Sequence, residues 1–390
     1  MQVSKRLAGI TGGGPDGWEL CYRARRMKDA GHQVIDLTVG EHDVGTDRAI
    51  LDAMHQATLD GHVGYTMFKG LPPLRERVAA RIAAQTGVPT APENVLIVPG
   101  GQAGLFATHH AACENGDTAL YIDPYYATYP GTIRSVGAVP KTVPARPGHA
   151  FQPQVADLEA AAPGAASLLI NSPNNPTGVV YSRATLEGIA GVCTDHGLWL
   201  ISDEVYDTQA WEGAHLSPRA LPGMAERTLV VGSMSKSHAM TGSRIGWVVG
   251  PADAIEHMGN LSTHTTYGVA GFVQMAAIFA LDLGPDFEAQ IAEPFRRRRG
   301  LVVDAVKTQN VVRAIPAQGA MYAMLDIRAT GLSGEDFAIR LLDRHHVAVM
   351  PGESFGQAAA GHVRMALTVA DDKLSAALRN LLDLAAELAG

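Results

Sequence analysis

Between about residues 94 and 250, short and wholly apolar runs alternate with segments of helical periodicity, and this alternation limits the possible folds most strongly. The apolar runs are residues 95–98, 118–122, 167–170, 198–202 and 228–232. Strands that are apolar along their whole length belong to mainly parallel sheets with helices on both faces. We therefore predict an α/β fold, in which ligands bind beyond the carboxyl ends of the strands.

The pattern changes after about residue 290, and a chain of 390 residues is too long for one compact core of ordinary size. We predict a large domain over residues 46–290. A smaller α+β domain is expected from residues 291–390 together with an N-terminal arm, residues 1–45. Its expected strands are residues 34–40 in the arm, and then 319–327, 346–350 and 363–367.

Composition excludes several classes of protein. The net charge of −8 argues against non-specific nucleic-acid binding. The three cysteines show neither a disulfide framework nor zinc spacing, which favours a reducing compartment and a cytoplasmic protein. We find no signal-peptide core and no run of the ~20 apolar residues that a membrane span needs. The arginines at 296–299 are predicted to form one solvated face of a helix.

A Ser-Met-Ser-Lys motif at residues 233–236 directly follows an apolar run, and Arg244 comes eight residues after Lys236. Burial at a strand end favours the neutral form of a lysine, which is a nucleophile for aldehydes. Arg244 and the hydroxyl of Ser233 offer hydrogen-bond donors that suit a phosphate. The combination indicates pyridoxal phosphate, and a loop lysine with a solvated arginine is the alternative.

Residues at two other strand ends suit the same cofactor. Gly101 and Gln102 open a helix after a strand, where backbone N–H groups favour a phosphate. Tyr126 follows the next strand and offers a ring that can stack on a flat cofactor. In isolation, a glycine-rich turn and an aromatic residue at the rim of a cleft explain these residues equally well.

Three further polar residues complete the candidate site. Asp203 ends a buried strand and needs a partner such as a protonated pyridine nitrogen, unless it caps a helix. Asn175 lies in a turn rich in Asn and Pro, and its amide donates a hydrogen bond without adding charge. Arg364 lies among apolar residues and is a candidate clamp for a substrate carboxylate, with a salt bridge to a neighbouring acid as the alternative.

Taken in order, these motifs resemble the class I/II aminotransferases, the fold type I family of pyridoxal phosphate (PLP) enzymes that includes aspartate aminotransferase. The resemblance spans about residues 34–367. It is strongest at Asn-Pro-Thr-Gly (175–178), Asp-Glu-Val-Tyr (203–206) and the lysine motif with Arg244. It implies a PLP-dependent enzyme that moves an amino group from an L-amino acid to a 2-oxo acid by a ping-pong mechanism.

The resemblance also implies a role for each candidate residue. Lys236 would form the Schiff base and carry the proton, Asp203 would hold the pyridine nitrogen, and Tyr206 would bond the ring hydroxyl. The implied cofactor-binding residues are Gly101, Gln102, Tyr126, Asn175, Asp203, Tyr206, Ser233, Lys236 and Arg244. The implied substrate-binding residues are Gly40, Asn175 and Arg364. Tyr65 would reach the phosphate of a neighbouring subunit, which implies a homodimer with shared active sites.

The substrate stays open, because Gln102 stands where some aspartate-preferring relatives carry a lysine. A PLP-dependent β-lyase of a sulfur amino acid, or a decarboxylating enzyme, would use almost the same residues. A PLP-binding regulatory module would need a DNA-binding domain, for which the chain leaves no room. An α/β binding protein without cofactor would leave the buried Lys236, Asp203 and Arg364 unexplained.

Overall fold

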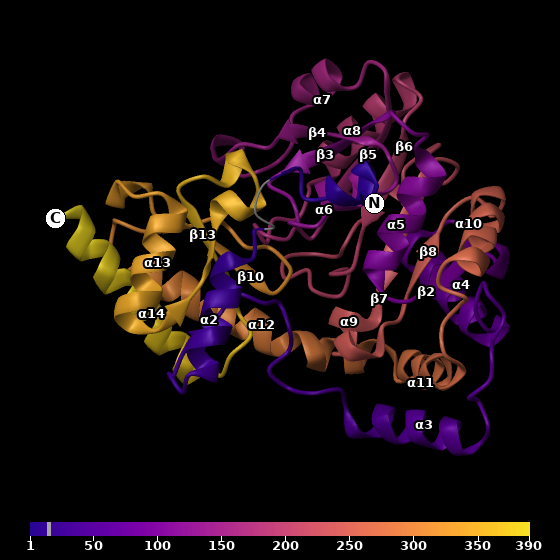
Figure 1. Cartoon of the computed structure of the whole chain (residues 1–390), viewed down its shortest axis with the longest axis horizontal. Coiled ribbons are helices and arrows are strands. Elements are labelled where there is room, and N and C mark those ends of the chain that lie inside the picture. The colour runs from indigo at the N-terminus through magenta and orange to yellow at the C-terminus, as the bar shows by residue number, and fades with distance from the viewer. Residues whose placement is uncertain (14–16) are drawn as a thin grey trace.

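The computed structural model describes residues 1–13 and 17–390, and its largest sheet has seven strands in the order β2-β8-β7-β6-β5-β3-β4 (Figure 1). These strands are β2 (Val95–Val98), β3 (Thr118–Asp123), β4 (Val139–Pro144), β5 (Ala165–Asn171), β6 (Trp199–Asp203), β7 (Thr228–Ser233) and β8 (Gly246–Val249). Neighbouring strands are parallel except for β8, which runs antiparallel to both β2 and β7. The predicted mainly parallel sheet is confirmed.

Strand β4 was not predicted from the apolar runs. Its sequence, Val-Pro-Lys-Thr-Val-Pro, contains two prolines and a lysine, and Val143 is its one buried residue. Proline lacks the N–H that a central strand needs, but an edge strand tolerates it. β4 lies at the edge of the sheet beside β3, so its sequence carries little of the periodicity of a buried strand.

Helices cover both faces of this sheet, because the strand side chains on both faces are apolar. One face packs against α5 and α10. The other packs against α7 and α8 at one end and against α4 and α11 at the other. The helices in this part are α3 (Arg48–Leu59), α4 (Pro72–Thr86), α5 (Gly101–Ala112), α6 (Tyr129–Ser135), α7 (Val155–Ala161), α8 (Arg183–Asp195), α9 (Met234–Ser237), α10 (Ala252–His264) and α11 (Gly271–Asp282).

A second core joins the two ends of the chain. It contains Leu20 and Leu37 from the N-terminal region together with buried residues of α12–α14 and a small antiparallel sheet of order β12-β13-β10-β9. These helices are α2 (Glu19–Asp29), α12 (Gly284–Val306), α13 (Gly334–His345) and α14 (Asp371–Ala389). The strands are β9 (Arg313–Ala314), β10 (Tyr322–Asp326), β12 (Met350–Pro351) and β13 (His362–Ala366). The short helix α1 (Lys5–Ala8) instead contacts α6.

The strand predicted at residues 34–40 is shorter in the structure. Only β1 (Ile35–Asp36) pairs, in parallel, with β11 (Val347–Ala348). The Asp36 carboxylate accepts a hydrogen bond from the backbone N–H of Thr38 (3.0 Å), and the chain leaves the sheet there. The backbone of Leu37 still bonds Ala348 (2.8 Å) and Ala366 (2.9 Å), and residues 38–40 then run into the site described below. The sequence Thr-Gly-Gly-Gly-Pro at residues 11–15 predicts a loop, and residues 14–16 lie outside the described part.

The prediction that the arginines at 296–299 share one solvated face is wrong. They lie within α12, where successive side chains point about 100° apart around the axis. Arg296 points outward and pairs with Glu293, with 59% of its side chain exposed. The Arg298 side chain is only 5% exposed and bonds Asp43 and Asp371. A run of four charges on one helix therefore reaches both solvent and core.

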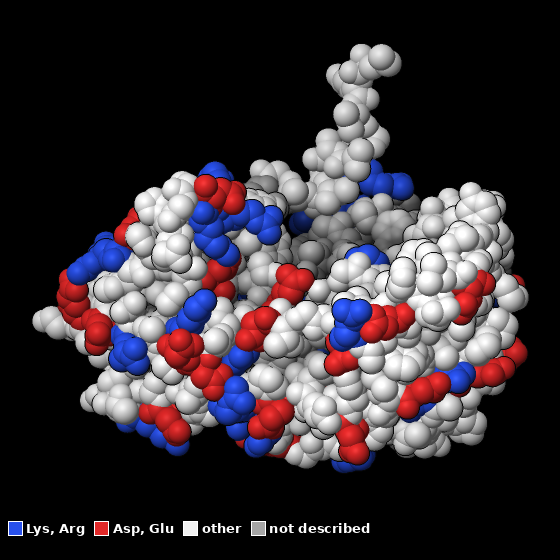
Figure 2. Space-filling model, turned by 90° about the horizontal axis from the view of Figure 1, so that it is seen from below, with Lys and Arg blue, Asp and Glu red and all other residues white. Residues whose placement is uncertain are grey.

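Acidic and basic side chains lie next to one another over the face shown in Figure 2. Elsewhere in the described part of the chain as well as on this face, charged side chains form surface ion pairs, and Arg77 with Asp282 and Arg344 with Glu387 are two of the pairs in the molecule. Such exposed pairs each contribute little to stability, but they disperse the net charge over the surface. No helix within residues 1–13 or 17–390 is long and apolar enough to cross a membrane.

Candidate active site

A cavity of about 290 Å³ lies where strands β5, β6 and β7 end. Parallel strands bring their carboxyl ends to one edge, and Asn171 at the end of β5 is directly paired with Asp203 at the end of β6. The cavity is lined by all the predicted site residues except Tyr65: Gly40, Gly101, Gln102, Tyr126, Asn175, Asp203, Tyr206, Ser233, Lys236, Arg244 and Arg364. Segments from both cores therefore meet in one place.

Lys236 lies on α9, directly after β7, and its amine points to the cavity. Its Nζ donates a hydrogen bond to the backbone oxygen of Gly40. Enclosure by the protein lowers the pKa of Lys236 to about 8, with smaller contributions from the charges of Arg364 and Arg244, although Glu41 opposes the shift. The amine is consequently a nucleophile near neutral pH.

Asp203 is 4% exposed and lines the cavity. Its Oδ2 accepts a hydrogen bond from the Tyr129 hydroxyl (2.6 Å), and its Oδ1 accepts one from the backbone N–H of Val205 (3.3 Å). Burial raises the pKa of Asp203 to about 6, while these bonds oppose the rise. Turns rather than a helix follow Asp203, so the helix-capping alternative does not apply.

Two tyrosines near Asp203 were missed from the sequence. Tyr129, on α6, bonds the carboxylate from a segment far away in the chain. Tyr322, on β10, shares a hydrogen bond of 2.9 Å with the hydroxyl of Tyr206, and both residues are buried. The approach of each tyrosine to its hydrogen-bond partner depends on tertiary packing, which the sequence does not record. For Tyr129, the one signal in the sequence was its position shortly after Tyr126.

Arg364 is 1% exposed and lies between the rings of Tyr322 and Phe355, with its Cζ 4.5 Å from each ring centre. Its guanidinium donates to Asn175 Oδ1 (2.9 Å) and to the backbone oxygen of Thr38. Its Nε is buried without a hydrogen-bond partner. Among the described residues Arg364 forms no ion pair, so the salt-bridge alternative fails and a carboxylate ligand would complete its bonding.

Asn175 is held by a second asparagine at the end of β5. The Asn171 side chain accepts from the backbone N–H of Asn175 (2.7 Å) and donates to the backbone oxygen of Asp203 (2.9 Å). This links the Asn-Pro turn to the strand end that carries the carboxylate. The two predicted motifs are thus parts of one hydrogen-bonded unit.

The part of the cavity next to the N-terminus of α5 suits a phosphate. Gly101 opens that helix, and Ser233 and Arg244 line this part of the cavity as well. Gly100 has a φ of +82°, and a side chain there would collide with the Arg244 guanidinium. The Ser233 hydroxyl also bonds that of Ser235 (2.9 Å), so hydroxyls, helix N–H groups and a guanidinium gather at one point.

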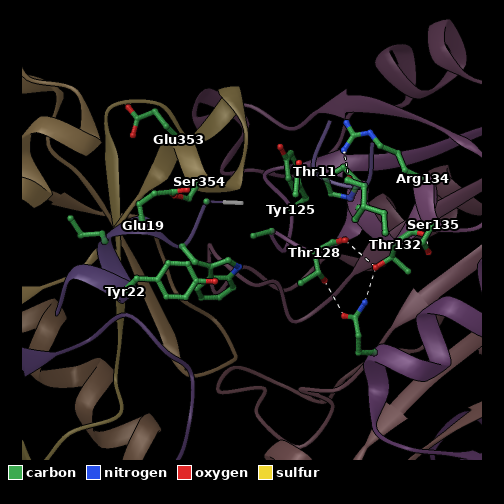
Figure 3. Close-up of a pocket in the computed structure, with 18 of the residues that line it drawn as sticks. Thr11, Glu19, Tyr22, Tyr125, Thr128, Thr132, Arg134, Ser135, Glu353 and Ser354 are labelled. Carbon is green, nitrogen blue, oxygen red and sulfur yellow. Dashed lines mark hydrogen bonds between the residues drawn. The ribbon is translucent and has the colours of Figure 1, made fainter. Parts of the chain in front are cut away.

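A wider cleft of about 1240 Å³ adjoins the cavity, and Trp18, Gln102 and Arg244 line both. Figure 3 shows Glu19, Tyr22, Glu353 and Ser354 on one side of the cleft, with Thr128, Thr132, Arg134 and Ser135 on the other. The Gln102 amide bonds Thr132 (2.7 Å) and Thr128 (3.0 Å). Its side chain is therefore engaged with these threonines at the boundary between the two spaces.

Tyr126 and Tyr65 differ in their placement. Tyr126 lines the cavity, and its ring lies edge-to-face with those of Trp18 (6.4 Å) and Tyr129 (5.8 Å). Tyr65 lies outside the cavity, is 89% exposed, and contacts Tyr267 at a ring distance of 5.0 Å. Within one chain, Tyr65 is therefore not part of the site.

The groups around the cavity fit pyridoxal phosphate. They are a nucleophilic amine, a buried carboxylate suited to a pyridinium nitrogen, an aromatic ring and a phosphate-binding end. The orphaned Arg364 Nε adds a place for the carboxylate of an amino acid. The fold and the site together define an enzyme that uses a phosphorylated aldehyde cofactor to act on amino acids.

Comparison with known proteins identifies the family. Residues 32–381 match the family model of aminotransferase class I and II. The chain is 40% identical, over the full length of both proteins, to the arginine–pyruvate transaminase of Pseudomonas aeruginosa. It is 32% identical to the aspartate aminotransferase of Geobacillus stearothermophilus, covering 98% of each chain. It superposes on the Thermus thermophilus aspartate aminotransferase structure with maleate at a TM-score of 0.92, with 31% identity, covering 98% of this chain and 100% of that one.

The chain belongs to the class I and II aminotransferase family. It is a PLP-dependent aminotransferase of fold type I, which acts on an amino acid and a 2-oxo acid. The predicted fold, cofactor and reaction are thereby confirmed. None of the relatives described above is named as a lyase, so the β-lyase alternative gains no support.

Proposed function

We propose that this aminotransferase takes a basic amino donor, with L-arginine as the first candidate, and passes the amino group to pyruvate. The carrying observation is the set of cations in the cavity. The described residues that line it include three cations, Lys236, Arg244 and Arg364. The reacting amine, the phosphate and the α-carboxylate would use these three cations, so none of the cations in the described cavity lining would remain for a second substrate carboxylate. The relative named arginine–pyruvate transaminase supports the same choice.

We propose the following roles for the residues of this site. The bound cofactor supplies an aldehyde that joins the substrate amine and a ring that withdraws electrons from Cα. Arg364 binds the α-carboxylate and orients the Cα–H bond toward Lys236. Lys236 Nζ would take the proton from Cα as general base and, as general acid, would deliver it to the aldehyde-derived carbon of the bound cofactor. Asp203 would keep a proton on the ring nitrogen, and Tyr206 and Asn175 would donate to the ring hydroxyl.

An absorption experiment tests the substrate proposal. The purified yellow protein is mixed with single donors: arginine, lysine, alanine, aspartate and glutamate. We expect arginine to bleach the visible band at the lowest concentration, and pyruvate to restore it. Faster bleaching by aspartate or glutamate would contradict the proposal and would point to a cation from elsewhere. Release of ammonia without bleaching would favour the lyase.

We also propose a homodimer in which Tyr65 reaches the phosphate end of the partner's site. Tyr65 lies outside its own cavity, and exposed apolar side chains surround its loop. These are Leu59, Val63, Met67 and Tyr267, each 49–67% exposed. A patch of this kind is typical of a protein interface.

In sedimentation experiments we expect a dimer. We also expect Tyr65→Ala to weaken PLP binding about tenfold, because the variant loses a hydrogen bond to the charged phosphate. A monomer with wild-type activity would contradict the proposal.

The predicted domain division and compartment stay proposals. We propose that residues 46–290 form one domain and residues 1–45 and 291–390 the other. The distribution of the described cores over the two parts of the chain supports this. We propose a cytoplasmic location because the cysteines, Cys21, Cys113 and Cys193, are all free.

A further inference from the structure

The segment of residues 36–46 runs past the site, and its backbone oxygens contact both of its substrate-side cations. Thr38 O accepts from Arg364, and Gly40 O accepts from Lys236 Nζ. Between them, Val39 O accepts from the Thr368 hydroxyl (3.1 Å). The distance between the Lys236 amine and the Arg364 guanidinium therefore depends on the conformation of this segment of backbone.

Arg298 holds the far end of this segment. Its two terminal nitrogens donate to both carboxylate oxygens of Asp43 at 2.9 and 2.6 Å. The same guanidinium donates to the backbone oxygen of Leu367 (3.0 Å) and to Asp371 Oδ1 (3.0 Å). Leu367 comes directly after β13, the strand that carries Arg364. One buried side chain thus joins the segment to the strand of the carboxylate-binding arginine.

The position of α12 explains why this link is rigid. Figure 1 shows α12 between α14 and α9, and it contacts both of them. α9 carries Lys236, and Asp371 opens α14. Arg298 therefore lies on a helix that contacts both sides of the site, and its side chain bonds Asp43 and Leu367 at the same time. A misplacement of about 1 Å of reacting groups can cost about 100-fold in rate.

We propose that Arg298 is a positioning residue for the substrate carboxylate: by holding Asp43 against the end of β13, it keeps the Thr38 and Gly40 oxygens and the Arg364 guanidinium in register. The inference rests on the proposed carboxylate-binding role of Arg364. Arg298 does not line the cavity and is not expected to touch substrate or cofactor.

Its neighbour Arg297 provides a matched control. Arg297 also binds Asp371 with two hydrogen bonds, of 2.7 and 2.9 Å, but it is half-exposed and has no described bond to Asp43 or Leu367. Loss of a charge and of the Asp371 bond is therefore common to Arg297→Met and Arg298→Met. Only Arg298→Met releases the 36–46 segment.

The test measures carboxylate binding by the PLP-loaded enzyme. The probe is 2-aminoisobutyrate, which has the α-carboxylate but no Cα–H bond, so it binds without turnover and changes the absorption spectrum. We expect Arg298→Met to weaken its binding 10- to 100-fold and to raise the KM of pyruvate similarly. The affinity for PLP should stay within about threefold, because the phosphate-binding residues lie elsewhere. Arg297→Met should bind both ligands as the wild type does.

A second variant covers the case in which Arg298→Met does not fold. Asp43→Asn removes the same link from the segment itself, whose carboxylate is partly exposed. It should weaken 2-aminoisobutyrate binding, and combining Asp43→Asn with Arg298→Met should cost little more than either change alone. Unchanged 2-aminoisobutyrate binding in both variants, or equal losses of carboxylate and PLP affinity, would overturn this inference and leave the proposed function intact. A wild type that binds neither the probe nor pyruvate would overturn the proposed function and this inference together.

Discussion

Lys236→Ala is expected to lower kcat for the overall transfer by about 10⁴-fold, because it removes the group that would move the Cα proton in both directions. Of the described residues that line the cavity, Lys236 alone carries an amine, and its pKa of about 8 makes the neutral amine available near neutral pH. The measurement is a single-turnover experiment that follows the visible band after mixing with arginine. Lys307→Ala serves as control, because this lysine is 70% exposed and lies at the end of α12.

The same residue should set the pH dependence of aldehyde capture. The lowered pKa means that the neutral fraction of Lys236 in the cofactor-free protein rises with pH only up to about 8. The rate of reaction with pyridoxal, which lacks the phosphate, should therefore increase about tenfold per pH unit below 8 and level off above it. An ordinary lysine would show a rise that continues to about 10.5. A continued rise would show that the pKa of Lys236 is not lowered, and equal capture by Lys236→Ala would show that its amine is not the nucleophile.

Asp203→Asn is expected to lower kcat by about 10²- to 10³-fold, the size of effect seen when one buried electrostatic partner of a transition state is removed. The amide keeps the shape of the carboxylate but loses the negative charge that would hold a proton on the ring nitrogen. Tyr129→Phe should lower kcat by only about tenfold, because it removes a single hydrogen bond of 2.6 Å to that carboxylate.

The two variants differ in their response to pH. The bond from Tyr129 lowers the pKa of Asp203, so Tyr129→Phe should raise that pKa above its value of about 6. A larger fraction of Asp203 is then protonated as the pH falls, and the deficit of Tyr129→Phe should grow as the pH is lowered from about 8 to about 6. The deficit of Asp203→Asn should instead shrink as the pH approaches 6, because wild-type Asp203 itself becomes partly protonated there. A Tyr129→Phe profile parallel to wild type would show that this hydroxyl does not influence the charge of Asp203.

Much of the site could be predicted from the sequence because its residues directly follow buried strands. The strand at residues 228–233 is buried along its length and mainly apolar, and the motif after it must lie at the sheet edge. Asp203 and Asn171 are adjacent for the same reason, since register places them side by side. Local sequence therefore contains most of the information for the cofactor end of the site.

The remaining features depend on contacts between distant segments, which no local pattern records. Tyr129 and Tyr322 are ordinary aromatic positions until packing brings their hydroxyls to Asp203 and Tyr206. Arg298 differs from its neighbours only in the direction of its side chain around α12. The edge strand β4 is half-exposed and interrupted by proline, so its sequence has only a weak tendency to form a strand. Its pairing with β3 makes it a strand nevertheless.

The antiparallel pairing of β7 with β8 makes Lys236 and Arg244 members of a single closed loop, since Ser233 at its start is paired with Gly246 at its end. Such a loop closes over a short chain distance, at a low cost in chain entropy, and its geometry does not depend on how α2 or β13 pack. Arg364 and Gly40, in contrast, reach the site from segments at opposite ends of the chain. Mild destabilisation, by low denaturant concentrations or heat, should therefore abolish amino-acid recognition before the protein loses its bound PLP.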